Sequence, residues 1–253
     1  MSALPLVSVV FITYKRYDLL KLTYDSFRNI CAYPNLQLIL SDDGSPQKIQ
    51  DAMRSLHFNK YLFSPKNRGL GNNQNKGITA TDGEYILHLQ DDCLCHDPGD
   101  FIEACLSVFD ELPDVGYIRL WNKPNLSIPY DVHRLKNDLI VRVYDDKHSS
   151  NRPDERDYVY SDQPHIKRRS FHERLGLYRE DVSMNNMEID FCRRFEQQGS
   201  IKGAWIEEYG NIFEHIGIKQ TFNPHVKSAL RRAWLENHPV LRFLYLLVRF
   251  GRK

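Results

Sequence analysis

Residues 83–92 read Gly-Glu-Tyr-Ile-Leu-His-Leu-Gln-Asp-Asp, a short apolar strand followed at once by two carboxylates. A second apolar run, Leu36–Leu40, also ends in a carboxylate pair, Asp42 and Asp43. Such runs alternate along the chain with stretches whose apolar residues recur at helical spacing. This alternation predicts an α/β protein with a doubly wound, mainly parallel sheet and flanking helices. In open parallel sheets, ligands bind beyond the carboxyl ends of the strands, so these carboxylates are the first candidates for a site.

The same pattern gives the expected elements. We predict strands over residues 7–13, 36–40, 60–63, 84–89, 115–121, 139–144 and 201–206. Helices are expected over 19–30, 49–56, 69–80, 101–112, 187–199 and, with an interruption near Pro239, 227–250. Residues 122–138 are rich in Pro and Asn, and 145–157 are polar, so both read as loops.

Composition excludes several classes of protein. With 253 residues, 42% hydrophobic and 26% charged, the chain is neither disordered nor collagenous. A net charge of +1 gives no sign of a nucleic-acid partner. Five cysteines without paired spacing fit a reducing cytoplasm, and no apolar run approaches the ~20 residues of a membrane-spanning helix.

The tail is apolar and basic. Residues 239–253 carry Arg and Lys beside Phe, Leu and Tyr, which favours a peripheral helix on the cytoplasmic face of an anionic membrane. A helix packed on the core or on a second copy, in a homodimer, is the alternative.

The paired carboxylates suggest chemistry. Asp91 and Asp92 would repel each other unless they are solvated or neutralised, and hard oxygen ligands suit Mn²⁺ or Mg²⁺ holding a diphosphate. A solvated loop pair is the alternative reading. Asp42 to Ser45 could equally be a turn or a helix cap, because Asp and Ser side chains hydrogen-bond nearby backbone.

Four segments together resemble the family 2 glycosyltransferases: residues 7–16, 40–45, 67–78 and 83–92. Their order and spacing both match, and the similarity extends over about residues 5–217. The resemblance implies a GT-A fold, a nucleotide-sugar donor, a divalent metal (Mn²⁺ or Mg²⁺) and inversion at the anomeric carbon.

The resemblance also implies a donor site. Tyr14 would pack against the nucleotide base, Asp42 would accept a hydrogen bond from it, and Arg68 would line the same pocket. Asp91 would lie nearer the sugar or ribose. Residues at the same strand ends complete the expected donor-binding group: Thr13, Arg16 and Asp43.

A metal site is implied by two further positions. Asp92 falls where the family's carboxylate reaches the metal, and His215, in Phe213-Glu214-His215, falls where an imidazole can complete the metal shell. One position departs from the pattern, since Leu89 stands where many members have a further Asp. Fewer carboxylates would then hold the ion.

The catalytic base is expected in residues 187–199, which resemble the family's acidic helix. Glu188 falls where the catalytic Asp usually lies, and would take the proton of the acceptor hydroxyl. Asp190 is the alternative base, although it could instead pair with an arginine of the same helix. The basic segment 163–171 remains open: it could contact a diphosphate or an anionic acceptor, or form a solvated face.

These expectations define one function and two alternatives. We predict transfer of a single sugar from a nucleoside diphosphate sugar, UDP or dTDP, to a saccharide or lipid-linked saccharide. Residues 1–121 would form the nucleotide-sugar-binding half, 122–225 the acceptor and base half, and 226–253 a C-terminal helical segment. A catalytically idle nucleotide-sugar-binding subunit and a sugar nucleotidyltransferase are the alternatives.

Overall fold

The computed structural model describes residues 3–121, 128–144 and 158–217. Internal contacts divide the chain into two units, Met1–Glu214 and His215–Lys253. The fold described below is that of the first unit. The predicted loop 145–157 and the predicted tail segment 226–253, with its membrane or dimer contact, lie outside the described residues.

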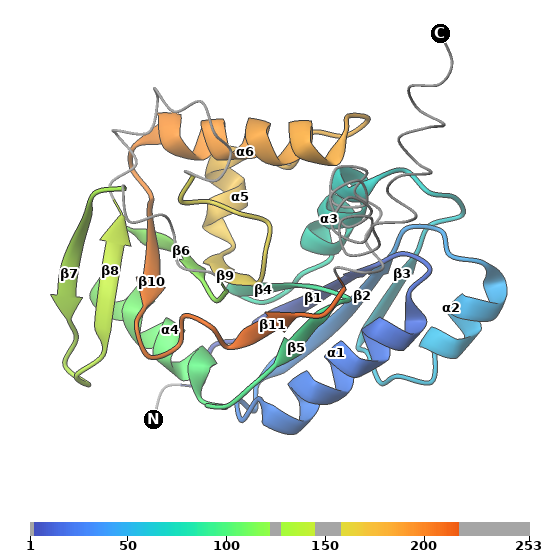
Figure 1. Cartoon of the computed structure of the whole chain (residues 1–253), viewed down its shortest axis with the longest axis horizontal. Coiled ribbons are helices and arrows are strands. Elements are labelled where there is room, and N and C mark those ends of the chain that lie inside the picture. The colour runs from blue at the N-terminus through green and yellow to red at the C-terminus, as the bar shows by residue number, and fades with distance from the viewer. Residues whose placement is uncertain (1–2, 122–127, 145–157, 218–253) are drawn as a thin grey trace, which may run out of the picture. The chain divides into compact units, whose positions relative to one another are not determined.

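The described strands form one large sheet and one small one (Figure 1). The large sheet has nine strands in the order β3-β2-β1-β4-β9-β6-β10-β8-β7. Their bounds are β1 (Val7–Thr13), β2 (Leu36–Asp42), β3 (Lys60–Phe63), β4 (Tyr85–Gln90), β6 (Val115–Arg119), β7 (Tyr130–Arg134), β8 (Ile140–Tyr144), β9 (His165–Arg168) and β10 (Lys202–Ile206). The small sheet pairs β5 (Cys93–Cys95) with β11 (Phe213–His215).

The sheet is mainly parallel, as predicted. Strands β3, β2, β1 and β4 run parallel, and β6 and β10 are parallel to each other. Strand β9 lies antiparallel between β4 and β6, with His165 opposite both His88 and Arg119. It therefore joins the two parallel groups into one sheet.

Helices cover both faces (Figure 1). On one face lie α1 (Tyr17–Ile30), α2 (Gln47–Met53) and α4 (Phe101–Glu111); on the other lie α3 (Leu70–Thr79), α5 (Ser170–Leu175) and α6 (Met184–Gln198). Alternating strand residues point to the two faces, so Leu87 and Leu89 of β4 join the first core while Ile86 joins the second. Ser183 begins α6 by accepting a hydrogen bond from the Asn186 amide at 3.3 Å.

Four strands and one helix were not predicted from the sequence, among them the two short strands β5 and β11 of the small sheet. Residues 130–134, expected in a loop, form β7 at the edge of the sheet. Strand β9 and helix α5 arise from the basic segment 163–171, which reads as polar surface. The prediction missed β9 because its lysine, Lys167, is fully buried among polar groups, and periodicity arguments assign charged residues to solvent.

Candidate active site

Two buried aspartates end strand β4 and face one arginine. Arg16, at the start of α1, donates from Nη1 to Asp92 Oδ2 at 2.9 Å and from Nε to Asp91 Oδ2 at 3.2 Å, and its Nη2 pairs with Asp91 Oδ1. Thr13 Oγ1 donates to Asp91 Oδ2 at 2.7 Å. The structure thus brings together the predicted residues Thr13, Arg16, Asp91 and Asp92.

Burial dominates the electrostatics of Asp91. The carboxyl is fully buried, which raises its pKa to about 6, while the positive charge of Arg16 acts in the opposite direction. Asp92 adds a like charge that raises the pKa of Asp91 further. The pair is therefore neutralised by an internal guanidinium and is not a solvated loop pair.

The carboxylates after β2 hold two neighbouring loops. Asp42 Oδ2 accepts from the Ser45 amide at 2.9 Å and from Gln50 Nε2 at 3.1 Å. Asp43 accepts the backbone amides of Arg68 at 2.8 Å and Gly69 at 2.9 Å. Asp42 therefore does close a turn, and Asp43 fixes the loop that carries Arg68. Hydrogen bonding of Asp42 to a nucleotide base stays a prediction.

The turn after Asp43 requires glycine. Gly44 has a φ of +80°, and a Cβ there would lie 2.4 Å from the carbonyl carbon of Lys66. Asn73 of α3 ties the ends of the two strands together, since its Nδ2 donates to the backbone oxygens of Thr13 and Ser41, at 3.1 Å each. The strand ends that carry the aspartates are therefore fixed by both backbone shape and hydrogen bonds.

A basic cavity of about 740 Å³ lies beside these loops. Its lining includes Lys66, Arg68, Asn72, Lys76 and Asp181. Arg68 is half-exposed and lies 3.6 Å from Glu180, while Lys76 Nζ donates to the Asp42 backbone oxygen and to Ser64 Oγ at 2.7 Å each. Burial lowers the pKa of Lys76 to about 8. The sequence analysis identified Arg68 but missed Lys76, although it follows Asn75 inside a matched segment.

Tyr14 lies at the same strand end as Thr13. Its ring is half-buried, and the Lys15 ammonium lies 4.8 Å from the ring centroid. Lys15 adopts a positive φ of 60°, and its amide donates to Ser45 Oγ at 2.8 Å. The loop after β1 is thus fastened to the loop after β2, and stacking of Tyr14 on a base stays a prediction.

The predicted base, Glu188, lies in the first turns of α6. Its Oε1 accepts from Ser161 Oγ at 3.1 Å and from the Asp162 amide at 3.2 Å. Asp190 instead forms an ion pair with Arg194 at 2.9 Å, one turn along the same helix. The geometry therefore favours Glu188, which faces the site, over Asp190, which is held by its own helix.

Asp162 connects the base to the aspartates. Gln90, which directly precedes Asp91, donates from Nε2 to the Asp162 backbone oxygen at 3.4 Å and to its Oδ2 at 3.5 Å. Asp162 in turn donates its amide to Glu188. Two contacts thus join the end of β4 to the start of α6. The sequence analysis did not single out Asp162, because it lies between the polar loop 145–157 and the basic segment 163–171, outside both.

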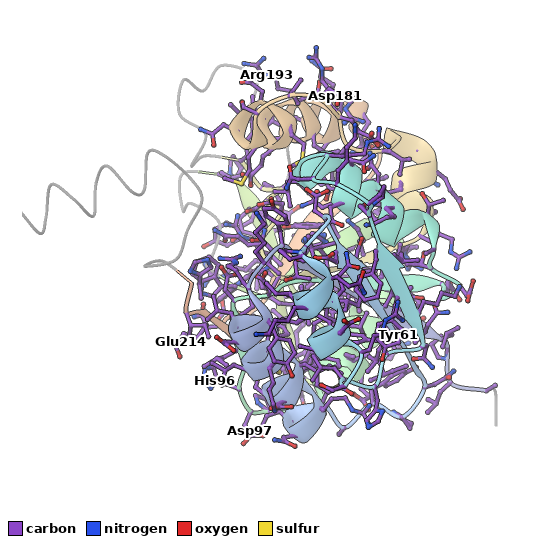
Figure 2. All side chains as sticks on the ribbon, turned by 90° about the vertical axis from the view of Figure 1, so that its right-hand side faces the viewer. Tyr61, His96, Asp97, Asp181, Arg193 and Glu214 are labelled. Carbon is purple, nitrogen blue, oxygen red and sulfur yellow. The ribbon has the colours of Figure 1, made fainter. Side chains whose placement is uncertain are left out.

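The predicted metal ligands are only partly brought together. Among the described residues, no three of His, Cys, Asp and Glu form a metal-binding group. The carboxylate oxygens of Asp92 have the donor chemistry that Mn²⁺ or Mg²⁺ prefers, although Arg16 already engages one of them. His215 is half-buried at the end of β11 and belongs to the second unit, so its role as a ligand stays a prediction. The preceding Glu214 pairs with His96 at 3.1 Å, and Figure 2 labels both on the surface of the protein.

The basic segment 163–171 does not form a solvated face, and its contact with a diphosphate or an anionic acceptor stays a prediction. Lys167 is fully buried, so it is not part of a solvated face. Arg168 Nε donates to the Val115 backbone oxygen at 3.2 Å, and Arg169 Nε donates to the Gly83 oxygen at 2.8 Å. These arginines fix strand ends and loops, because a guanidinium offers several donors to buried carbonyl groups.

The sequence profile described as glycosyl transferase family 2 matches residues 8–177. The chain belongs to glycosyl transferase family 2. The match includes the aspartates after β2 and β4 and the Asp162 segment, and it ends before Glu188. No protein with a curated description matches the chain.

Solved structures share the fold. A mannosyltransferase, PcManGT from Pyrobaculum calidifontis in complex with GDP-Man and Mn²⁺, is 16% identical over 80% of this chain and 55% of its own, with a TM-score of 0.57. S. aureus TarS residues 1–349 with UDP-GlcNAc is 15% identical over 79% of this chain and 58% of its own, with a TM-score of 0.56. The same protein with UDP gives 13% identity, coverage of 82% and 59%, and a TM-score of 0.60. The chain therefore has the GT-A fold and spans less than two thirds of these structures.

No helix in the described part of the chain combines the length and apolar character needed to cross a membrane.

Proposed function

We propose that the protein is an inverting glycosyltransferase that moves one sugar from a nucleoside diphosphate sugar to a hydroxyl of a saccharide acceptor. The observation that carries this proposal is a pair of hydrogen bonds. Gln90, the residue before Asp91, donates to Asp162, and the Asp162 amide donates to Glu188. These contacts support Glu188 as the base, because they link its carboxylate to the strand end that carries the aspartates expected to hold the donor. Family membership supports the transferase over the sugar nucleotidyltransferase alternative.

The nucleotide would lie over the basic cavity. Its volume of about 740 Å³ is in the range of small-molecule sites, and Lys66, Arg68 and Lys76 bring positive charge to its lining. Asp42, whose backbone oxygen accepts from Lys76 of the lining, and Tyr14, which follows β1, are the predicted partners of the nucleotide base. Uracil and thymine present the same hydrogen-bonding edge, so UDP and dTDP sugars are the proposed donors.

The displacement needs only a base and a stabilised leaving group. Glu188 would accept the proton of the acceptor hydroxyl while its oxygen attacks the anomeric carbon and the bond to the diphosphate breaks. The described neighbours of Glu188 are neutral donors, Ser161 Oγ and the Asp162 amide, which hold the carboxylate in one orientation. No covalent glycosyl-enzyme is required.

A divalent ion, Mn²⁺ or Mg²⁺, is proposed at Asp92. Arg16 would have to release that carboxylate for the ion to bind. Once bound, the ion would neutralise charge on the leaving diphosphate. The proposed acceptor is a saccharide or lipid-linked saccharide, and the proposed location is the cytoplasm.

The test is a thermal-shift and calorimetric panel of nucleoside diphosphates and their sugars, each with and without Mn²⁺. Stabilisation by one base class is expected, since a ligand that binds only the folded protein raises its melting temperature. Asp92→Asn should remove the Mn²⁺ dependence, while the exposed Asp25→Asn should keep it. Nucleotide binding without any sugar transfer would favour the idle nucleotide-sugar-binding subunit, and no binding under any condition would refute both readings.

A further inference from the structure

A layer of buried polar side chains lies beneath Glu188, on the face of the sheet that α3, α5 and α6 cover. His88 and His165 stack with their ring centroids 4.9 Å apart, and Lys167 is fully buried on the same strand as His165. Burial lowers the pKa of Lys167 to about 7 and keeps both imidazoles neutral by lowering their pKa well below the usual value. Among the described contacts, the acidic side chain of this layer is Asp162, which lies next to Glu188.

Asp162 and Glu188 place two carboxyl groups together. Asp162 is 7% exposed, and its carboxyl lies within hydrogen-bonding reach of the Glu188 carboxyl. Burial raises the pKa of Asp162 well above its usual value, and the neighbouring Glu188 charge raises it further. Burial and the adjacent Glu188 charge therefore both favour the protonated form of the Asp162 carboxyl.

The remaining contacts of Asp162 are weak. Gln74 Nε2 and Gln90 Nε2 each lie 3.5 Å from its Oδ2, at the outer limit for a hydrogen bond. Among the described residues, the other titratable or charged groups around the pair are Lys167 on β9, Tyr117 and Arg119 on β6, Cys192 on α6, and Tyr160 and Tyr178 in the loops before β9 and α6. Tyr160, Tyr178 and Cys192 are neutral at pH 7, because burial raises the pKa of each.

We propose that Asp162 is a positioning residue for the base: its protonated carboxyl donates to Glu188 and holds Glu188 ionised and aimed at the acceptor. This inference rests on the proposed function, in which Glu188 is the base. In the transfer step the acceptor O–H proton passes to Glu188, the acceptor oxygen bonds to the anomeric carbon, and the sugar–phosphate electrons leave with the diphosphate. Asp162 keeps its own proton throughout.

The first test follows the carboxyl groups directly and needs no activity. Carboxyl carbons of Asp and Glu are labelled with carbon-13 in the full chain, and their NMR shifts are followed from pH 3 to pH 9. Asp162, assigned with Asp162→Asn, should titrate well above the usual range of an aspartate in the unaltered protein. Glu188→Gln removes the like charge and should lower that midpoint by at least one pH unit.

Asp190→Asn is the matched control for this titration. Asp190 lies on the same helix but pairs with Arg194, so its loss should leave the Asp162 midpoint unchanged. An Asp162 midpoint that is the same in Glu188→Gln as in the unaltered protein would overturn the proposal. So would a normal midpoint near pH 4 in the unaltered protein.

The second test is the pH profile of kcat for sugar transfer. Asp162→Asn keeps a donor toward Glu188, so kcat at pH 7 should stay within about threefold, and the fall in kcat at alkaline pH should disappear. Asp162→Ala lacks the donor and should lower kcat at least tenfold with little change in the donor KM. Equal losses in both variants, or an unchanged alkaline limb in Asp162→Asn, would contradict the proposal.

The two tests separate this inference from the proposed function. If the Asp162 midpoint depends on Glu188 but the protein transfers no sugar, the interaction of the two carboxyl groups is supported and the proposed transferase function is refuted. Transfer that depends on Glu188 while Asp162 titrates independently would sustain the transferase and refute the pair.

Discussion

The site contains two carboxylate pairs whose charge is balanced in different ways. Asp91 and Asp92 are both held by the Arg16 guanidinium, at 2.9 Å in the case of Asp92. Glu188 accepts from neutral donors, and the carboxyl of its partner Asp162 has long contacts, 3.5 Å each, from Gln74 and Gln90. The first pair is fixed by a permanent cation, and the second by the proton that Asp162 retains.

The two pairs also differ in their proposed roles. Asp91 and Asp92 are expected to hold the donor, whereas Glu188 is the proposed base. A guanidinium stays charged near neutrality, so Arg16 keeps its ion pairs with Asp91 and Asp92 at pH 7, and protonation of Asp91, whose pKa is about 6, would loosen them only below that pH. Asp162 instead holds Glu188 through a protonated carboxyl, so loss of that proton at alkaline pH would replace a hydrogen-bond donor by a repelling charge. The following predictions test this contrast.

Glu188→Gln should cause the largest loss of sugar transfer. Loss of a general base lowers kcat about 100-fold or more, while calorimetric affinity for the donor should not change because Glu188 lies at the other end of the site. Glu103→Gln, an exposed change on α4, is the control and should keep full transfer. Unchanged transfer by Glu188→Gln would move the base elsewhere, with Asp190 as the next candidate.

Arg16→Ala should cause the largest loss of stability. It leaves two buried carboxylates without their cation, which costs about 3 kcal/mol of unfolding free energy in urea denaturation. Combining it with Asp91→Asn should recover part of the loss. Lys21→Ala breaks the exposed pair of Lys21 with Asp25 and should leave the unfolding free energy almost unchanged, because solvent screens that pair. Equal effects of Arg16→Ala and Lys21→Ala would show that Arg16 is not a buried neutralising group.

Asp43→Ala should lower the stability of the protein by freeing the loop that carries Arg68 and Gly69. It leaves the amides of Arg68 and Gly69 without their acceptor, which costs about 2 kcal/mol of unfolding free energy. Asp43→Asn keeps one acceptor oxygen and should lose about half as much. An unaltered urea midpoint in Asp43→Ala would mean that solvent replaces both hydrogen bonds.

Lys76 should make nucleotide binding depend on pH. Its pKa of about 8 means that the ammonium is present at pH 7 and lost above pH 8. Calorimetric affinity for UDP should therefore fall about tenfold between pH 7 and pH 9.5, because a charged hydrogen bond to phosphate is lost. Lys76→Arg stays charged and should remove this fall. A pH dependence that persists in Lys76→Arg would assign it to another group.

Much of the fold follows from local sequence patterns. The parallel strands β1 and β3 have the predicted bounds, because each is a short apolar run with polar residues after it. The carboxylates at the ends of β2 and β4 were predicted for the same reason, since parallel strands bring their carboxyl ends to one edge. The family resemblance added Arg68 and Glu188, which no local pattern distinguishes.

Contacts between distant segments were not predictable. Arg16 and Asp92 are separated by 76 residues, and their ion pair depends on how α1 begins beside the end of β4. Asp162 and Lys76 were missed because burial changes their chemistry, and burial depends on the packed α6 and the loops after β2 and β3. A sequence pattern gives the type of a side chain, whereas its environment comes from the folded chain.

Strand β9 also has a consequence for how the chain folds. It bonds β4 on one side and β6 on the other, yet it follows them in sequence by at least 45 residues, from Arg119 to His165. During synthesis, the edges of β4 and β6 that pair with β9 would therefore lack hydrogen-bond partners until residue 168 has been synthesised. Open strand edges recruit other chains, so a polypeptide truncated between α4 and β9 should aggregate, and late insertion of β9 should limit the folding rate.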